Sequence, residues 1–236
     1  MRKIMLLNAK GGCGKSTLTT NLASYYARQG KSVLIADFDP QGSSLEWLES
    51  RPQDRPVIRG IAAWREPLRV PRTTDYVIMD VPAGCHGPVL TAHVKRAQTL
   101  VVPVLPSPTD IRAAAHFIHE VLLMGRISRD ETRIAVVANR VRENTAIQGA
   151  FEQVLGSIKP SYATLNTQIY NNLERFLSRL KIPFVTTLRE SNNYLVADAR
   201  GLGIFDLSHS MAARDVEQWE PLIKWLDSKR SLPGPG

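Results

Sequence analysis

Short, continuous apolar runs alternate along the chain with longer segments whose apolar residues recur at helical spacing. The short runs are typical of β-strands and the longer segments of amphipathic helices. Most short runs lack polar residues at alternate positions, as expected when both faces of a sheet are covered. The predicted strands are Lys3 to Leu7, Ser32 to Ala36, Tyr76 to Asp80, Thr99 to Val104, Arg133 to Ala138 and Phe184 to Leu188.

The helical segments complete a strand–helix alternation. The predicted helices are Lys15 to Gln29, Pro88 to Arg96, Asp110 to Met124, Ala146 to Leu155, Leu165 to Leu180 and a last helix near Asp215 to Ser228. This order predicts a single-domain α/β fold: a doubly wound, mostly parallel twisted sheet with helices on both faces. Residues 41–75 are less regular, because four prolines interrupt an Arg-rich stretch, and we expect them to cover one end of the sheet.

Composition adds limits to this picture. The 236 residues, 43% hydrophobic and 22% charged, fit one large globular domain at residues 1–230, with 231–236 expected to be disordered. No apolar run approaches the roughly 18–20 residues of a membrane span, so we expect a cytoplasmic protein. Cys13 and Cys85 are interpreted as free thiols, since two cysteines make no disulfide framework. The net charge of +8 makes binding to a polyanion about as plausible as a merely basic surface.

Residues 9–17 read Ala-Lys-Gly-Gly-Cys-Gly-Lys-Ser-Thr, directly after a predicted strand and directly before a predicted helix. This context favours a phosphate-binding loop, because glycines let backbone N–H groups turn toward phosphates and the helix N-terminus attracts anions. In such a loop Lys15 reaches the β- and γ-phosphates, and the Ser16 hydroxyl binds Mg²⁺. Ala9 stands where the usual pattern has a glycine.

The loop resembles the deviant Walker A motif of the ParA/MinD family, K-G-G-x-G-K-[S/T]. The matching residues are Lys10, Gly11, Gly12, Gly14, Lys15 and Ser16. The resemblance implies ATP and Mg²⁺ as cofactors, with Cys13 and Thr17 also at the nucleotide. It further implies a homodimer with ATP sandwiched at the interface, where Lys10 reaches the partner's phosphates, so that Lys10 and Lys15 both serve catalysis. A solvated lysine in a glycine turn is the alternative for Lys10.

Acidic residues follow two predicted strands. Residues 37–41, Asp-Phe-Asp-Pro-Gln, resemble the family's D-x-D-P-Q segment. This implies that Asp39 positions the attacking water and contacts the metal shell, while Asp37 supports the magnesium site. Asp80 resembles the Walker B aspartate and can hold a Mg²⁺-bound water. One oriented carboxylate and one Mg²⁺ suffice for a slow ATPase. As alternatives, all three could be turn or helix-capping residues.

Asn139 directly follows the predicted strand Arg133 to Ala138 and resembles the family's base-reading asparagine. Its amide can donate to and accept from adenine, but asparagine at a strand end is also an ordinary turn residue. The resemblance covers nearly the whole chain. Residues 145–165 look longer than compact members of the family need, so partner contacts are not transferred to this region.

The resemblance implies an ATPase that positions or segregates a cargo such as a plasmid, a chromosome or a microcompartment, with hydrolysis stimulated by an unidentified adaptor protein. Acidic residues on the polar side of the last helix would be repelled by anionic lipid, so we expect non-specific nucleoid DNA, not a membrane, as the binding surface. The expected DNA contacts are Arg189, Arg200, Arg214, Lys224, Lys229 and Arg230. The alternatives are a MinD-like membrane-associated ATPase, an electron donor resembling the nitrogenase iron protein, and a P-loop enzyme acting on a small molecule.

Overall fold

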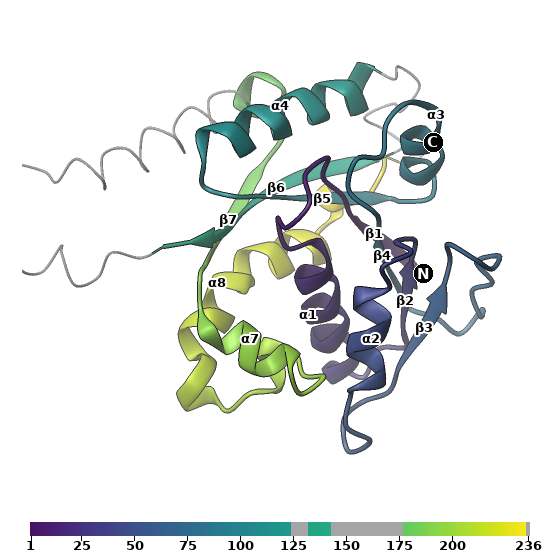
Figure 1. Ribbon diagram of the computed structural model, residues 1–236, viewed down its shortest axis with the longest axis vertical. Coiled ribbons are helices and arrows are strands. Elements are labelled where there is room, and N and C mark those ends of the chain that lie inside the picture. The colour runs from purple at the N-terminus through teal and green to yellow at the C-terminus, as the bar shows by residue number, and fades with distance from the viewer. Residues whose placement is uncertain (124–131, 143–176, 235–236) are drawn as a thin grey trace, which may run out of the picture.

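The computed structural model describes residues 1–123, 132–142 and 177–234 (Figure 1). In these parts of the chain, seven strands form one sheet in the order β3-β2-β4-β1-β5-β6-β7. All neighbouring strands pair in parallel. The strands are β1 Arg2–Leu6, β2 Val33–Asp37, β3 Ile58–Ala62, β4 Tyr76–Asp80, β5 Thr99–Val104, β6 Arg133–Val141 and β7 Phe184–Arg189. The parallel sheet of the predicted fold is confirmed.

Helices cover both faces of this sheet (Figure 1). They are α1 Lys15–Arg28, α2 Ser43–Glu49, α3 Gly87–Val94, α4 Pro108–Leu123, α7 Asn192–Asp198 and α8 His209–Asp227, with 3₁₀ turns η1 Ile204–Asp206 and η2 Lys229–Ser231. Helices α3 and α4 bury Leu90 and Phe117 in one core, and α1 and α8 bury Leu22 and Trp219 in the other. Two apolar layers on one sheet explain why most strands read as continuous apolar runs.

The expectation for residues 41–75 was wrong in part. This stretch contains α2 and the edge strand β3, which pairs with β2 from Val33↔Ile58 to Asp37↔Ala62. The strand is hard to see in the sequence because only Ile58 and Ala62 of its five residues are buried. The last helix also begins earlier than expected, at His209, and α7 was not predicted. The predicted helix Ala146 to Leu155, and Leu165 to Leu180 up to residue 176, lie outside the described residues.

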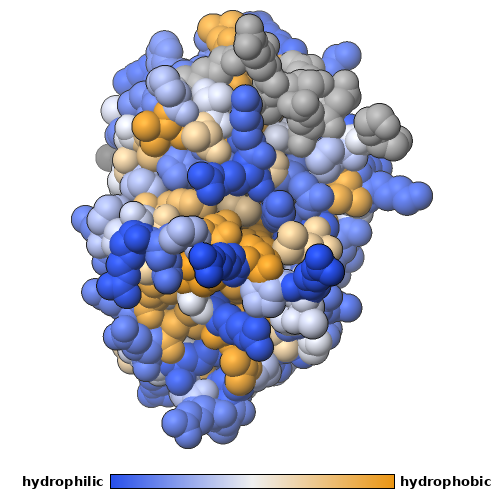
Figure 2. Space-filling model, turned by 90° about the vertical axis from the view of Figure 1, so that its right-hand side faces the viewer, coloured by the Kyte–Doolittle hydropathy of each residue, from blue (hydrophilic) through white to orange (hydrophobic). Residues whose placement is uncertain are grey.

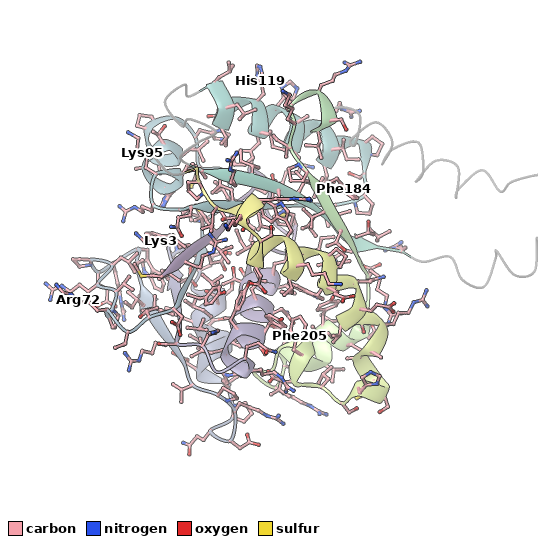
Figure 3. All side chains as sticks on the ribbon, turned by 180° about the vertical axis from the view of Figure 1, so that it is seen from behind. Lys3, Arg72, Lys95, His119, Phe184 and Phe205 are labelled. Atoms are coloured by element: carbon pink, nitrogen blue, oxygen red, sulfur yellow. The ribbon has the colours of Figure 1, made fainter. Side chains whose placement is uncertain are left out.

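The C-terminal end of the described chain packs against the N-terminal ends of strands β1, β5 and β6. Ser231 is fully buried, its carbonyl accepts a 2.6 Å hydrogen bond from Thr99 Oγ1, and its hydroxyl accepts one of 2.8 Å from Arg2. Arg133 Nε donates to the Leu232 carbonyl at 3.0 Å. The packed part of the chain therefore continues to Leu232, two residues beyond the boundary expected at 230. Phe205 packs in the core on the α1 and α8 side (Figure 3), where its ring makes a tilted contact with Tyr25 and an edge-to-face contact with Trp219.

Candidate nucleotide-binding site

The loop between β1 and α1 turns at glycines. Gly12 and Gly14 have φ values of +73° and +95°, a left-handed region that strains other residues. Gly14 also touches a neighbouring strand, since a Cβ there would lie 2.1 Å from Asn139 Nδ2. Backbone conformation and packing thus both require glycine at this position, directly before the N-terminus of α1. The loop has the geometry that an anion at a helix N-terminus needs.

The Lys15 side chain contacts the glycine loop that precedes it. The residue is buried, and Nζ donates to the Lys10 carbonyl at 3.4 Å. Cys13 donates its thiol to the same carbonyl at 3.3 Å. Burial raises the pKa of the Cys13 thiol, so this cysteine is a protonated packing residue of the loop. Lys15 is therefore placed to meet phosphates that enter the loop of its own chain.

Lys10 is bound by helix α4. Its Nζ lies 3.1 Å from Asp110 Oδ1, with 39% of the Lys10 side chain exposed. Asp110 also accepts a hydrogen bond from Ser107 Oγ, which fixes the carboxylate at the start of the helix. In the single chain, the second lysine of the motif is thus held by its own helix. Its predicted contact with a partner's nucleotide stays a prediction.

The two predicted acidic strand ends meet at one edge of the sheet. Asp37 of β2 is the in-register partner of Asp80 of β4, and Leu6 before the P-loop is the partner of Asp80 on the other side. Asp37 is buried and accepts hydrogen bonds from Asp39 N–H at 2.9 Å and from Ser44 Oγ at 2.7 Å. Asp37 therefore shapes the loop that carries Asp39, and Asp39 lines a cavity over the P-loop that is described below.

Asp80 is an unusual carboxyl group. Burial raises its pKa from 3.8 to about 7, and a hydrogen bond from Ser16 offsets this only in part. Its Oδ2 is buried and has no hydrogen-bond partner in the described chain. A buried carboxylate oxygen without a partner, beside a serine hydroxyl, fits a hydrated Mg²⁺. Among the described residues, no three His, Cys, Asp or Glu side chains could hold a metal alone. The site thus suits an ion that also uses phosphate and water oxygens.

Replacing Asp80 by asparagine is expected to raise the thermal unfolding temperature of the nucleotide-free protein at pH 8. From pH 3.8 to about 7 the unfolded chain ionises Asp80 while the folded chain keeps it protonated, so wild-type stability falls as pH rises through this window. The gain from Asp80→Asn should therefore disappear toward pH 4. Calorimetry across this range tests it, with exposed Asp54→Asn as control. A gain of equal size at both pH values would contradict the shifted pKa.

Asn139 lies within β6, not at its end, because the strand continues to Val141. The residue is buried, and its Nδ2 donates to the Cys13 carbonyl of the P-loop at 2.8 Å. This contact ties the loop to β6. The predicted contact with adenine is not tested by it and stays a prediction.

A cavity of about 470 Å³ lies over these residues. Its lining includes most of the P-loop between Gly11 and Thr17, Asp39, Asn139 and most of the segment between Arg189 and Leu195. We did not expect this last segment at the site, although it follows β7 as the P-loop follows β1. Carboxyl ends of parallel strands share one edge, and that rule alone would have found it. The cavity brings Asp39 together with the predicted nucleotide-binding residues except Lys10 and Cys13, and Asp80 is hydrogen-bonded to Ser16 in its wall.

The six predicted DNA contacts do not share one part of the surface. Arg189 lies at the cavity and forms two hydrogen bonds, of 2.6 and 3.2 Å, with the fully buried Asp215. Lys224 pairs with Glu220 on its own helix at 2.6 Å. Lys229 and Arg230 belong to η2, which lies at the end of the sheet away from the P-loop, where Thr99 begins β5. Arg200 and Arg214 are exposed on the α7 and α8 side.

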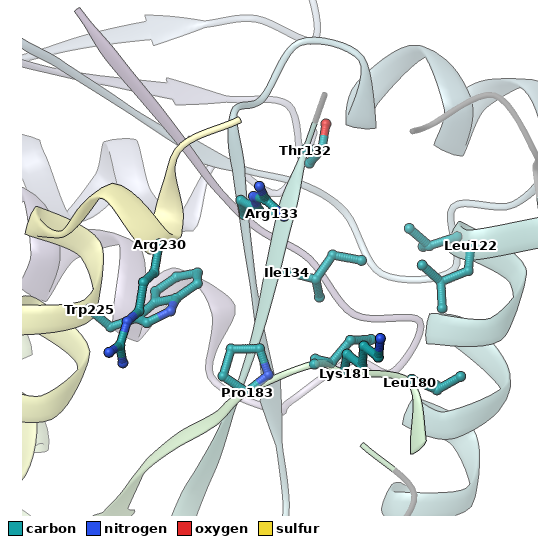
Figure 4. Close-up of a pocket in the computed structure, with 11 residues that line it drawn as sticks. Leu122, Thr132, Arg133, Ile134, Leu180, Lys181, Pro183, Trp225 and Arg230 are labelled. Carbon is teal, nitrogen blue, oxygen red and sulfur yellow. The ribbon is translucent and has the colours of Figure 1, made fainter. Parts of the chain in front are cut away.

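A second cavity, of about 420 Å³, lies at the end of the sheet away from the P-loop, where β6 and β7 begin (Figure 4). Apolar residues such as Ile134, Pro183 and Trp225 line it, together with the cations Arg133, Lys181 and Arg230. Its described lining has no P-loop residue and no carboxylate, so the cavity over the P-loop is the candidate nucleotide site. None of the helices in the described parts of the chain is long and apolar enough to span a membrane.

The parallel sheet, the glycine loop before α1 and the carboxylates at neighbouring strand ends define a P-loop nucleotide-binding protein. The model of the CobQ/CobB/MinD/ParA nucleotide-binding domain matches residues 4–204. The chain therefore belongs to this family of nucleotide-binding ATPases, which confirms the ParA/MinD resemblance.

Individual relatives agree with this assignment. Maintenance of carboxysome distribution protein A from Halothiobacillus neapolitanus is 25% identical over 211 residues, covering 86% of this chain and 87% of that protein. The solved ATP complex of a Cyanothece McdA variant has a TM-score of 0.66 at 16% identity, covering 94% of this chain and 96% of that one. The pNOB8 ParA structure bound to nonspecific DNA has a TM-score of 0.52 at 19% identity, covering 75% of each chain. At these identities the two structures show the shared fold.

Proposed function

We propose that this protein is an ATP-dependent dimerising ATPase that binds DNA non-specifically and positions a cargo inside the cell. The arrangement of the two P-loop lysines carries the proposal. Lys15 is buried within the loop, whereas Lys10 is half-exposed and held only by Asp110 among the described residues. One lysine thus serves the nucleotide of its own chain, and the other is available to a nucleotide presented by a second copy.

The proposed reaction is slow hydrolysis of ATP that depends on Mg²⁺ and on stimulation by an adaptor. Lys15 and Ser16 would hold the phosphates and the ion, with Asp80 binding through water and Asp37 keeping the Asp39 loop in place. Bound Mg²⁺ supplies charge neutralisation at the phosphates. Asp39 would orient the attacking water from the cavity wall. Most of the rate acceleration in phosphoryl transfer comes from positioning and charge stabilisation, which these groups can supply.

DNA is favoured over a membrane by the packing of α8. Its apolar residues Trp219, Leu222 and Leu226 are fully buried against the sheet, so they are not available to enter a lipid surface. The net charge of +8 favours a polyanion, and a relative with the same fold has been solved on nonspecific DNA. A carboxysome distribution protein among the relatives supports a protein assembly as the cargo, beside a plasmid or chromosome.

Light scattering and DNA mobility shifts test this function together. With ATP and Mg²⁺ the Asp39→Ala protein is expected to form a stable dimer that retards random-sequence duplex DNA, because two weak DNA surfaces combine in the dimer. ADP should give a monomer with weaker DNA binding. A protein that stays monomeric with ATP, or binds anionic vesicles but not DNA, would refute the proposal.

Replacing Asp110 by asparagine is expected to lower the ATP concentration needed for half-maximal dimerisation. The change frees Lys10 from a partly exposed ion pair worth about 0–1 kcal/mol, which corresponds to a shift of up to about fivefold. Light scattering across an ATP titration measures the shift. Glu120→Gln, which removes a different acid from the same helix, is the matched control. An unchanged titration would show that Asp110 does not restrain Lys10.

A further inference from the structure

The Arg-rich stretch that the nucleotide site does not use forms an exposed surface at the edge of the sheet. In the described sheet, strand β3 pairs with β2 on one side only. On one face of β3, Gly60 lies against α2, where a Cβ would come within 2.6 Å of Leu45. Arg59 and Ile61 point to the other face, where Arg59 is exposed and Ile61, like Leu68 and Val70 of the following loop, is partly buried against the core on the α3 and α4 side. We define the β3 face as Arg59, Ile61, Trp64, Arg65, Leu68 and Arg69.

The β3 face combines an apolar centre with unpaired cations. Arg59, Arg65 and Arg69 are exposed, and the described chain offers none of them an ion-pair partner. Arg65 lies over the Trp64 ring, 5.9 Å from its centroid. Glu66 is the exposed acid within this stretch. The side of the molecule that carries β3 shows an apolar area surrounded by hydrophilic side chains (Figure 2).

More positive charge flanks the face. Arg72, later in the same loop, and Lys95, at the end of α3, are exposed and project from this side of the molecule (Figure 3). Arg96 lies over the Phe38 ring, 5.5 Å from its centroid. Apart from Arg51, which pairs with Asp206, residues 51–75 carry five arginines against the acids Asp54, Glu66 and Asp75. The net charge of this stretch is therefore positive, and it attracts acidic groups.

The face touches the loop that carries Asp39. Register places Ala62 of β3 beside Asp37 of β2, so Trp64 comes next to the segment that follows Asp37. The indole lies against Gly42, where a Cβ would be 3.4 Å from Trp64 Cη2. Gly42 N–H donates to the Asp39 carbonyl at 2.9 Å and has a left-handed φ of +68°. An occupant of the β3 face would thus contact an aromatic side chain that supports this turn.

We propose that the β3 face binds an acidic segment of a partner protein, with an apolar side chain over Trp64 and Leu68 and carboxylates at Arg59, Arg65 and Arg69. The inference rests on the proposed function, because it gives a surface to the adaptor. Tryptophan and arginine around an apolar centre are typical of the energetic core of protein interfaces. A DNA backbone would satisfy the arginines but offers no apolar group to the centre.

Fluorescence anisotropy with defined peptides tests the proposal. The probe is a labelled 16-residue peptide in which Glu alternates with Leu, compared with Gln-Leu and Glu-Ser peptides of the same length. The Glu-Leu peptide is expected to bind best, since it alone matches both the charge and the apolar centre. Equal binding of all three would overturn the proposal. So would equal binding of the Glu-Leu and Glu-Ser peptides, which would indicate a general polyanion surface.

Charge reversal locates the binding. Combined Arg59→Glu, Arg65→Glu and Arg69→Glu is expected to weaken Glu-Leu binding by at least about tenfold. The control reverses three exposed cations elsewhere, with Lys31→Glu, Arg179→Glu and Lys181→Glu, and so changes the net charge equally. Trp64→Ser should also weaken binding, whereas Trp64→Phe should retain it. Equal loss in the control would overturn the assignment.

These measurements use the ADP-loaded single chain, so their result does not depend on dimerisation. Failure to dimerise with ATP would refute the proposed function while the peptide result stands. Normal dimerisation with equal peptide binding by the face variant and the control variant would refute the β3 face alone.

Discussion

Replacing Lys10 by alanine is expected to abolish ATP-dependent dimerisation while leaving ATP binding to the single chain nearly intact. The only described contact of the Lys10 ammonium is a partly exposed ion pair with Asp110, whose loss costs about 0–1 kcal/mol. In a dimer the same ammonium would lie between triphosphates in a desolvated interface. Removing one partner of such a contact costs about 2–5 kcal/mol, which weakens the dimer by about 30-fold or more.

Analytical ultracentrifugation with ATP and Mg²⁺, next to titration of a fluorescent ATP analogue, separates the two effects. Lys31→Ala is the matched control, because Lys31 is an exposed lysine away from the cavity. Lys15→Ala should behave differently and lose nucleotide binding itself. A Lys10→Ala protein that dimerises like the wild type would exclude a role for this lysine between subunits.

Replacing Asp215 by alanine is expected to destabilise the protein by about 3–5 kcal/mol, because it removes the buried carboxylate that Arg189 binds. The Asp215 side chain is fully buried and accepts hydrogen bonds from Arg189, Ser191 and Asn193. Burial alone would raise the pKa of Asp215, but the Arg189 and Asn193 hydrogen bonds outweigh it and hold the pKa below 3.8. The carboxylate is therefore ionised at neutral pH, and its contribution is lost as pH falls below that value.

Urea unfolding at pH 7 measures this loss. Glu217→Ala, an exposed acid on the same helix, should change stability by no more than about 0.5 kcal/mol. The comparison also decides how Arg189 is used. If Arg189→Ala lowers DNA binding without lowering stability, the arginine is a DNA contact and not the structural partner of Asp215.

The nucleotide site was predictable from sequence to the extent that it follows local rules. The glycine loop with Lys15 follows the apolar strand β1, and Asp37 and Asp80 end the apolar strands β2 and β4. Parallel strands bring such positions to one end of the sheet. The segment from Arg189 to Leu195 follows β7 and obeys the same rule, although it was not identified from the sequence. Asp110 was not predictable in this way, because its place depends on how α4 packs and no pattern near it in the chain reveals it.

The fold shows the same limit. The buried strands were found because both their faces are apolar, but β3 was missed, since Arg59 and Gly60 break the run at the open edge. Arg51 is a related case. It belongs to the Arg-rich stretch of residues 41–75, yet its side chain is only 5% exposed and its guanidinium lies 3.1 Å from Asp206. Composition cannot distinguish a solvated arginine from one that, like Arg51, forms an ion pair between two segments distant in the sequence.

The central place of the first strand constrains synthesis of the protein. β1 pairs with β4 on one side and with β5 on the other, so its pairing is not complete until Val101 has been translated. Such distant pairing is slow, and unfinished parallel sheets expose apolar surface. A nascent chain that has emerged only as far as β2 therefore has its glycine loop but lacks β4 and β5, the two strands that hold β1 in the sheet. Ribosome-bound fragments ending before β5 should be sensitive to protease and unable to retain nucleotide.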